Sequence, residues 1–403
     1  MERKFAGIVL GLLALLPGCR GPLAAIQAAD IPPPGRPPEL GPAPPMPPTV
    51  RRPDVPEVRV EIVAAGLEVP WDLVFLSRNR ILITERPGRI RLCENGRLDT
   101  RPYHTLPTVD VGEGGLMGMA LDPHYPQRPY VYVMYTYRAP TGRAVNRVSR
   151  FRDTGTGLAD ETVIFDGIRA GLNHNGGGLR FGPDGMLYIS TGDAWVAELA
   201  QELESPCGKI LRIRPDGTIP ADNPFPNSPV YALGLRNVQG MAWHPETKEL
   251  WVTNHGPSGE LANLHARDSV YIVRPGSNCG WPRVLGVTRR KGIESPILYY
   301  PDSSVPPGAA IFYTGDLFPA LRGNFLFCCL GGEHLQRVIL DGPRRVVGLE
   351  RWWEEGDHRG RYGRLRTIVQ GPDGALYLTT TNRDGRGIVR PGDDKVLRVV
   401  PAR

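Results

Sequence analysis

Cysteine is scarce in this sequence. Only six of the 403 residues are cysteines, and they stand at positions 19, 93, 207, 279, 328 and 329. Their spacing does not match a zinc-binding pattern. Cys328 and Cys329 are adjacent, so in a strand their side chains would point to opposite faces. A zinc site is therefore not indicated, while buried free thiols and disulfide bridges remain equally consistent with the sequence.

Concentrated positive charge is also lacking. The formal net charge is +6, and the lysines and arginines are dispersed along the chain. A nucleic-acid-binding surface needs a clustered basic stripe interleaved with aromatic residues. The sequence therefore predicts no nucleic-acid partner.

Long apolar segments are limited to one short run near the N-terminus. The positive start MERK is followed by FAGIVLGLLALLPG, which is too short to span a membrane comfortably. This pattern is typical of an export signal. LLPGC resembles a bacterial lipoprotein cleavage box with Cys19 as the lipidated residue, although Pro17 departs from that pattern; a secretory signal cut after an alanine near residue 28 is the alternative. We expect residues 1–30 to direct export, to the periplasm or to a lipid anchor in a bacterial envelope.

Residues 31–56 are rich in proline. Such a segment favours an extended polyproline conformation and cannot bury a core, so we expect a disordered linker. The remaining chain, residues 57–403, carries the apolar content that a folded domain needs. Its many glycines and prolines favour short strands and turns over long helices.

Residues 57–403 repeat one unit six times. Each copy has a turn rich in Pro, Asp or Gly, followed by alternating apolar residues, and the copies lie at 75–86, 121–136, 181–193, 243–256, 317–330 and 370–382. The unit predicts an all-β fold, a six-bladed β-propeller with four-stranded blades and long inserted loops. Strands near 58–64 and 395–400 would close the ring by sharing a blade. A β-sandwich is the structural alternative, but it does not explain the recurrent unit.

One glycine-rich stretch, GLNHNGGGLRFGPDGMLYISTGD at 171–193, contains His174 and ends in Asp193. In a propeller, loops at one end of the channel carry the chemistry. Asp193 follows the next predicted strand, where its carboxylate could orient the imidazole of His174 as a general base. The glycines would allow a flat ligand to approach the backbone. The alternative is a loop histidine bound to water, with Asp193 capping a turn.

Several other loops add polar residues to the same predicted pocket. Arg364 and Arg366 alternate onto one face of a strand. The other contributions are Glu113 in a glycine-rich loop, Arg236 and Asn237 before a strand, and the His-Gly-Pro loop at 254–260. Arginines around one base predict a pocket for a flat, polyanionic ligand.

The order of these motifs resembles that in one enzyme family. The motifs are EGGLMGMALDP, HNGGGLRFGPDGMLYISTGD, CGKILRIRPDGTIPADNPF, YALGLRNVQGMAWHP, NHGP, RPGSNCGWP, FYTGDLFPALRGNF and RLRTIVQGPDGALYL. Together they resemble the soluble glucose/sorbosone dehydrogenases, including the aldose sugar dehydrogenases. Those enzymes are six-bladed propellers that use pyrroloquinoline quinone (PQQ) and calcium.

The resemblance implies a role for each matching residue. His174 would be the base that takes the anomeric proton of an aldose as hydride leaves C1 for the quinone, and Asp193 would support it. The product would be a lactone, and the electrons would pass to an unidentified acceptor. The implied cofactor-binding residues are Glu113, Arg236, Asn237, His255, Ser303, Arg364 and Arg366. The implied calcium ligands are the carbonyl groups of Gly256 and Pro257.

The sequence departs from the family pattern at several positions. Glu113 and His255 stand where the glucose enzyme has glutamines, Gly331 stands where a lysine often contacts the quinone, and Cys279 replaces a tyrosine. The segment 258–273 carries an insertion that leaves Glu260 or Asp268 as the acid near the metal loop.

Two other functions compete with the dehydrogenase. The same superfamily includes the hedgehog-interacting proteins, whose similar domain serves recognition, so a non-catalytic binding propeller is the first alternative. The second is a calcium-dependent lactonase, whose metal would need a ring of carboxylates and asparagines that this sequence does not offer. A binding module has no evident need for the intact set His174, Asp193, Arg236, Asn237, Arg364 and Arg366, which therefore favours the dehydrogenase.

Overall fold

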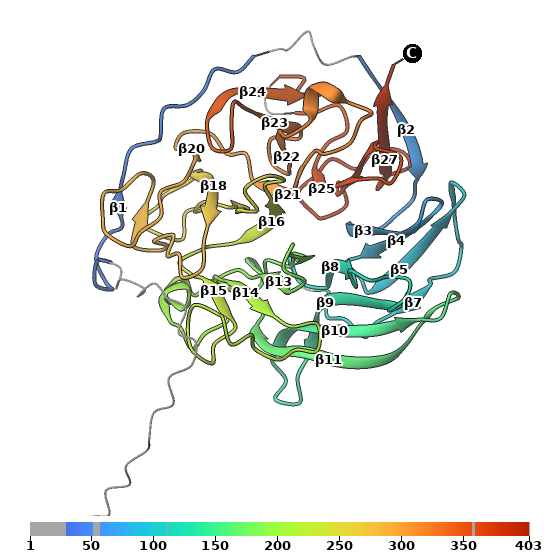
Figure 1. Cartoon of the computed structure of the whole chain (residues 1–403), viewed down its shortest axis with the longest axis horizontal. Helices are drawn as coiled ribbons and strands as arrows, with labels where there is room; N and C mark the ends of the chain where they lie inside the picture. The colour runs from blue at the N-terminus through green and yellow to red at the C-terminus, as the bar shows by residue number, and fades with distance from the viewer. Residues whose placement is uncertain (1–29, 51–56, 111, 357–358, 403) are drawn as a thin grey trace, which may run out of the picture.

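A computed structural model describes residues 30–50, 57–110, 112–356 and 359–402. Its strands form six antiparallel sheets around a central axis (Figure 1). The all-β six-bladed propeller predicted from the repeats is confirmed. Each of the six repeated units covers the turn between the first and second strands of one blade, which explains why a turn signal precedes each alternating segment.

The first three blades follow one another along the chain. The first contains β3 (Pro70–Ser77), β4 (Arg80–Glu85), β5 (Arg89–Glu94) and β6 (Arg97–Leu98), with β7 (His104–Thr105) also paired to β5. The second contains β8 (Leu116–Leu121), β9 (Tyr130–Arg138), β10 (Ala144–Asp153) and β11 (Leu158–Arg169). The third contains β12 (Leu179–Phe181), β13 (Leu187–Ser190), β14 (Ile210–Ile213) and β15 (Val230–Ala232), with the short 3-10 helix η1 (Ala197–Gln201) inserted.

The last three blades complete the ring. The fourth contains β16 (Val238–Trp243), β17 (Leu250–Asn254), β18 (Asp268–Val273) and β20 (Leu298–Tyr300). The fifth contains β21 (Pro307–Phe312), β22 (Phe325–Cys329), β23 (Leu335–Leu340) and β24 (Val346–Trp352), with the 3-10 helix η2 (Pro319–Leu321) between its first two strands. The sixth contains β25 (Leu365–Gln370), β26 (Leu376–Thr380) and β27 (Val396–Pro401).

The ring closes through a strand from its other end. β2 (Val58–Ala64) pairs antiparallel with β27 and supplies the outer strand of the sixth blade, as the sequence predicts for 58–64 and 395–400. Apolar side chains fill the spaces between blades. Between the fourth and fifth blades, for example, the buried ring of Trp251 packs against Phe312 and Phe325. This packing fixes the loops at the ends of the channel relative to one another.

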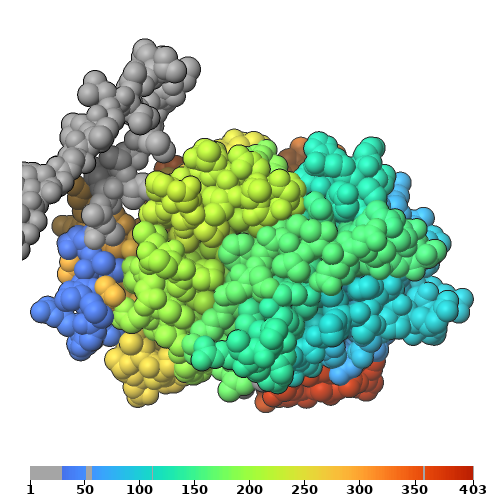
Figure 2. All heavy atoms as spheres, turned by 90° about the horizontal axis from the view of Figure 1, so that it is seen from below, coloured from blue at the N-terminus to red at the C-terminus, as the bar shows by residue number. Residues whose placement is uncertain are grey.

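The segment 30–50, named here the N-terminal strap, lies on the outside of the propeller (Figures 1 and 2). β1 (Glu39–Leu40) pairs in parallel with β19 (Val284–Leu285), and Thr49 forms a bridge with Leu349 of β24. Arg290 forms ion pairs with Glu39 and Asp30. The strap is extended, and an extended chain can pair with exposed blade edges even when many of its residues are prolines.

Residues 51–56 of the predicted linker and residues 1–29, including Cys19, lie outside the described residues. Within the described ranges, no helix is long and apolar enough to cross a membrane. The cysteines of the propeller, Cys93, Cys207, Cys279, Cys328 and Cys329, are buried free thiols. The sequence left both disulfide bridges and buried free thiols open for these five residues, and the structure shows free thiols.

Candidate active site

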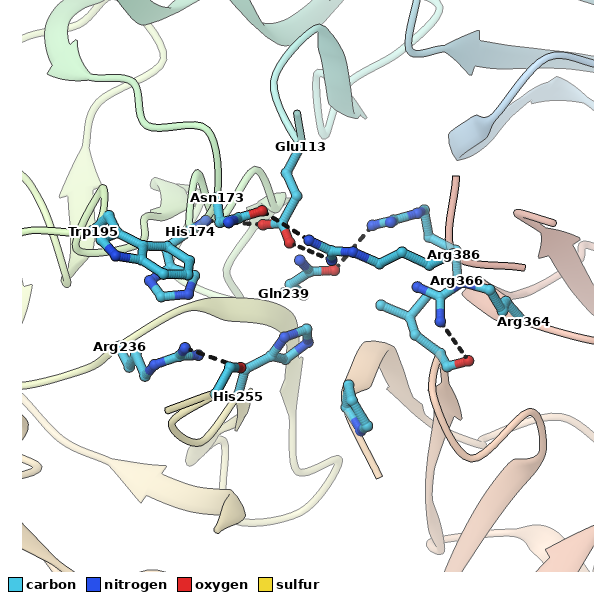
Figure 3. A pocket seen from close by; sticks show the side chains of 13 residues that line it. Glu113, Asn173, His174, Trp195, Arg236, Gln239, His255, Arg364, Arg366 and Arg386 are labelled. Carbon is cyan, nitrogen blue, oxygen red and sulfur yellow. Dashed lines mark hydrogen bonds and ion pairs between the residues drawn. The ribbon is translucent and has the colours of Figure 1, made fainter. Parts of the chain in front are cut away.

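The loops at one end of the channel enclose a cavity of about 330 Å³. Figure 3 shows side chains from several blades converging on it. Six predicted site residues line the cavity: Glu113, His174, Arg236, His255, Arg364 and Arg366. The structure adds Asn173, Trp195, Gln239, Ser258, Pro306, Leu330 and Arg386.

His174 and Asp193 form a buried pair. Nδ1 of His174 lies 2.7 Å from Oδ1 of Asp193. The carboxylate also accepts hydrogen bonds from the backbone N–H of Trp195 at 2.9 Å and from the indole N–H of Trp281 at 2.8 Å. Because its oxygens accept from these donors, we assign the ring proton to Nδ1, which then donates to Asp193. Nε2 of the neutral ring is therefore left as a proton acceptor, the arrangement that a general base requires.

The backbone at His174 is constrained. Its φ is +62°, in the left-handed region that few non-glycine residues adopt. Its N–H donates to Oε2 of Glu113 at 2.8 Å, and its carbonyl accepts from the N–H of Ala194. Such a conformation is kept only where the surroundings over-determine it, and it is common at functional sites. These contacts fix where the imidazole lies.

The glycines after His174 have a different role from the expected one. A Cβ at Gly176 would lie 2.5 Å from Cα of Thr191, and one at Gly177 would lie 2.8 Å from the ring of Trp71. A Cβ at Gly178 would meet the hydroxyl of Ser190 at 2.7 Å. The expectation that these glycines admit a ligand is therefore wrong: they allow neighbouring strands to approach closely.

Glu113 is held as a carboxylate. Burial alone would raise its pKa, but the ion pair with Arg386 (2.7 Å) outweighs burial and, with His255 and the His174 N–H nearby, lowers the pKa to about 2. Arg386 also donates to the side-chain oxygen of Asn173 at 2.8 Å. Arg386 thus connects two loops that line the pocket.

Three of the four arginines in the cavity are paired with carboxylates. Arg236 pairs with Glu260 (2.5 Å), Arg364 with Asp384 (2.9 Å) and Arg386 with Glu113. In the described part of the chain, Arg366 has no such ion pair; its Nη1 donates to the neutral Oε1 of Gln239 at 3.0 Å.

The fourth arginine therefore carries an uncompensated charge. Burial lowers the pKa of Arg366 to about 10, which still leaves the group charged at neutral pH. Its Nε is buried and has no hydrogen-bond partner. A buried cation with an unused donor is costly, so the cavity is built to receive an anion.

Asn237 does not line the pocket, although its chain neighbour Arg236 does. Its Oδ1 accepts the N–H of Gly176 at 2.9 Å, whereas its buried Nδ2 has no hydrogen-bond partner. His255, in contrast, is fully engaged with the protein at Nε2, which donates to the carbonyl of Pro307 at 2.9 Å. Burial lowers the pKa of His255 to about 3, so it is a much poorer base than a histidine backed by a carboxylate.

Gly256 and Pro257 of the predicted metal loop are buried, and the two candidate acids near them are both hydrogen-bonded to other groups. Asp268 accepts the N–H of Gly256 at 2.9 Å and that of Val305 at 2.7 Å, and burial raises its pKa to about 6. Glu260 binds Arg236 and accepts the N–H of Ser258. No cluster of three or more His, Cys, Asp or Glu side chains suited to a metal occurs among the residues that the structure covers. The carbonyl groups of Gly256 and Pro257 therefore remain the candidate ligands.

Some predicted positions lie away from the cavity. Ser303 is half-buried and does not line it, and Cys279 is buried among apolar residues. Gly331 is also not part of the lining, although the preceding residue, Leu330, is.

Gln239, Trp195 and Arg386 line the cavity but were not among the predicted site residues. The three differ in whether their position in the sequence could have indicated this. Gln239 lies two positions after Asn237, a spacing that places alternate side chains on one face of a strand. Trp195 lies two positions after Asp193. Arg386 carried no local signal, because its partner Glu113 is 273 positions away.

Comparisons with known proteins agree with this geometry. The family description "Glucose / Sorbosone dehydrogenase" matches residues 67–390. A Thermus thermophilus protein described as an oxidoreductase (glucose dehydrogenase) is 45% identical, with a TM-score of 0.77 over 85% of this chain and 100% of its own. The PQQ-bound aldose sugar dehydrogenase of Streptomyces coelicolor is 33% identical, with a TM-score of 0.74 over 88% and 99%.

Two curated relatives differ in what their names imply. The aldose sugar dehydrogenase YliI of Escherichia coli is 31% identical over 81% of this chain and 91% of its own. The human Hedgehog-interacting protein is 28% identical over 80% of this chain and 50% of its own. The family description covers most of the propeller, and the chain therefore belongs to the glucose/sorbosone dehydrogenase family.

Proposed function

We propose that this protein is an exported, PQQ- and calcium-dependent dehydrogenase that oxidises an aldose at C1 to the lactone. The observation that carries the proposal is the pairing of an uncompensated, buried Arg366 with a carboxylate-backed His174 in one cavity. A buried cation suits an anionic cofactor, and a neutral imidazole suits proton removal.

The residues present fit PQQ, a flat quinone that bears three carboxylates. Arg366 offers an unused Nε and Asn237 an unused Nδ2, both buried, so a ligand that accepts hydrogen bonds there would relieve two unsatisfied donors. Arg364 and Arg236 would add positive charge from the neighbouring loops. We infer that these four residues hold the cofactor.

When bound, PQQ supplies a quinone that accepts the hydride released from the anomeric carbon. The chain's own contribution is the proton. Nε2 of His174 accepts it from the anomeric hydroxyl, and Asp193 stabilises the resulting imidazolium through its bond to Nδ1. Loss of one proton and one hydride from the sugar leaves the lactone.

Calcium belongs to the proposal through the carbonyl groups of Gly256 and Pro257. Calcium prefers oxygen ligands, and backbone carbonyls are among those it uses. The N–H of Gly256 is fixed by Asp268, which holds the loop in place. A cation here would stabilise negative charge that develops on a bound quinone.

Reconstitution tests the proposal. Purified protein is titrated with PQQ and Ca²⁺ by absorbance, and dye reduction is then followed with a panel of aldoses. Stoichiometric binding and sugar-dependent reduction are expected. Arg366→Ala removes a charge-assisted contact and should weaken PQQ binding about tenfold to a hundredfold, whereas Arg322→Ala, at an exposed arginine outside the pocket, should not.

The main alternative is a non-catalytic recognition propeller, which the similarity to the Hedgehog-interacting protein favours. The same titration separates the two functions. If the wild-type protein binds no PQQ at stoichiometric amounts with Ca²⁺ present, the dehydrogenase is excluded and the recognition module is preferred.

A further inference from the structure

Trp195 is a large apolar side chain left at the mouth of the cavity. It is 47% exposed, whereas His174 beside it is 3% exposed. The two rings stack, with centroids 4.7 Å apart and planes inclined by 23° (Figure 3). One face of the indole therefore covers the imidazole, and about half of the side chain remains open to solvent.

The protein fixes this exposed ring firmly. Ala194 and Trp195 both adopt left-handed backbone conformations, with φ of +51° and +64°. The N–H of Trp195 donates to Oδ1 of Asp193, the same oxygen that lies 2.7 Å from Nδ1 of His174. One carboxylate thus sets the positions of both the base and the indole. Strained backbone that is retained at a cavity points to a functional demand on the residue.

The loop beyond Trp195 is anchored as well. Lys209 is buried, and its Nζ donates to the carbonyls of Leu199 and Ala200 in η1 at 2.7 and 3.0 Å. η1 begins two residues after Trp195. The indole therefore stands on a segment that is tied down at both ends, so it cannot easily turn away from the pocket.

Polar groups line the same cavity as the indole. Arg386 donates hydrogen bonds of 2.7 and 2.8 Å to Glu113 and Asn173 (Figure 3). An exposed aromatic face in one cavity with charged and amide groups matches the two kinds of surface on a sugar. The C–H groups of a pyranose ring pack on the electron-rich face of an aromatic ring, and its hydroxyls bond to polar groups.

We propose that Trp195 is a specificity-determining residue: the part of the indole that extends beyond the stacked imidazole is the platform against which the pyranose ring of the aldose lies, beside His174, which removes its anomeric proton. This inference rests on the proposed function for the identity of the substrate. It assigns the preference for ring-form sugars to the indole, and it makes Asp193 the group that sets the distance between platform and base. Trp195 contributes binding that is equal in the ground state and the transition state, so it acts on KM.

The test compares Trp195→Ala, Trp195→Phe and a matched control, Ile388→Ala. Ile388 is an exposed apolar residue in the same loop as Arg386 and is not part of the cavity lining. Glucose and xylose affinities are measured by calorimetry, on the protein as purified and on holoenzyme reduced chemically so that it cannot turn over. KM, kcat and the pH profile of kcat are measured on the PQQ-loaded enzyme.

We expect Trp195→Ala to weaken sugar binding and to raise KM roughly tenfold with little change in kcat. Trp195→Phe should retain most of the affinity, and Ile388→Ala should match the wild type. Unchanged affinity and KM in Trp195→Ala would overturn the inference. So would a loss confined to kcat with an altered pH profile, because the indole would then serve only to position His174.

The two proposals can fail separately. Sugar binding that depends on Trp195 in a protein that does not oxidise sugar would leave the platform standing and overturn the dehydrogenase. Sugar oxidation with the same KM and affinity in Trp195→Ala as in the wild type would support the dehydrogenase and overturn the platform. Absence of any sugar binding by the wild-type protein would overturn the platform.

Discussion

At the residue scale, the site depends on which groups remain unpaired. Asp193 and Glu113 are engaged by several donors, and three arginines are neutralised by carboxylates. Nε2 of His174 and Nε of Arg366 are left for a ligand. The chemistry of the pocket follows from this difference, because a buried group without a protein partner binds a ligand more strongly than one that is already satisfied.

His174→Ala should therefore lower turnover while cofactor binding is retained. A general base contributes about 10²- to 10⁴-fold in rate, and the arginines that would hold PQQ remain. Steady-state rates at saturating PQQ provide the measurement. Near-wild-type turnover in the variant would show that His174 is not the base.

Arg386→Gln should change the pH dependence of stability. The pKa of Glu113 is lowered from 4.5 to about 2 in the folded protein, so its ion pair stabilises the fold above pH 4.5 and loses that effect as pH falls towards 2. Since Arg386 is half-exposed, the loss at pH 7 should be about 1 kcal/mol. When the pH falls from 4.5 to 2, the free energy of unfolding should therefore decrease less in the variant than in the wild type.

Urea unfolding at pH 7 and at pH 3 measures this difference. Arg143→Gln, at an exposed arginine in the turn between β9 and β10, is the matched control and should leave both values unchanged. Equal destabilisation of the Arg386 variant at the two pH values would argue against the ion pair as the cause.

At the scale of elements, the outer strand β2 is the one that holds the ring closed. The Ala402 N–H donates to the Glu57 carbonyl, so the alternation of an antiparallel ladder makes Arg59 and Val400 a hydrogen-bonded pair. Arg59→Pro should remove that bond and lower the free energy of unfolding by about 2 kcal/mol. Arg59→Ala keeps the N–H and is the control.

Thermal unfolding of the two Arg59 variants measures the contribution of the closure. The proline variant should unfold at a lower temperature than the alanine variant, since both lose the same side chain. If the two variants unfold together, β2 does not contribute to stability through its ladder.

At the scale of the whole molecule, the N-terminal strap connects the propeller to the predicted export segment. The strap begins at Asp30, whose N–H donates to the carbonyl of Lys291. If Cys19 is lipidated, the propeller would be linked to the membrane on the side where the strap starts. Two acyl chains anchor a protein stably, whereas one gives only marginal binding.

Membrane fractionation tests this location. The wild-type protein should partition with membranes, and Cys19→Ala should not be processed in the same way. Cys93→Ala, at a buried thiol within the propeller, is the control and should fractionate like the wild type. Identical soluble behaviour of the wild type and the Cys19 variant would remove the lipoprotein proposal.

The sequence by itself determined the six blades and six of the thirteen residues that line the pocket. A turn followed by alternating apolar residues is a local pattern, and it specifies a hairpin wherever it recurs. The residues that border those hairpins, such as His174, Arg236 and Arg364, therefore had to fall at one end of the ring. Closure by β2 could be predicted because the two terminal segments both alternate.

The tertiary structure alone decided which loops meet across the channel. Arg386 reaches Glu113 only because the sixth blade closes beside the first, and no spacing in the chain encodes that contact. The same is true of the strap, whose partners at 284–285 and 349 are distant blade edges. The glycines at 176–178 looked like ligand-contacting residues, yet they admit neighbouring strands. Hairpins are encoded by neighbours in sequence, whereas the pocket is made by residues that become neighbours only when the ring is packed and closed.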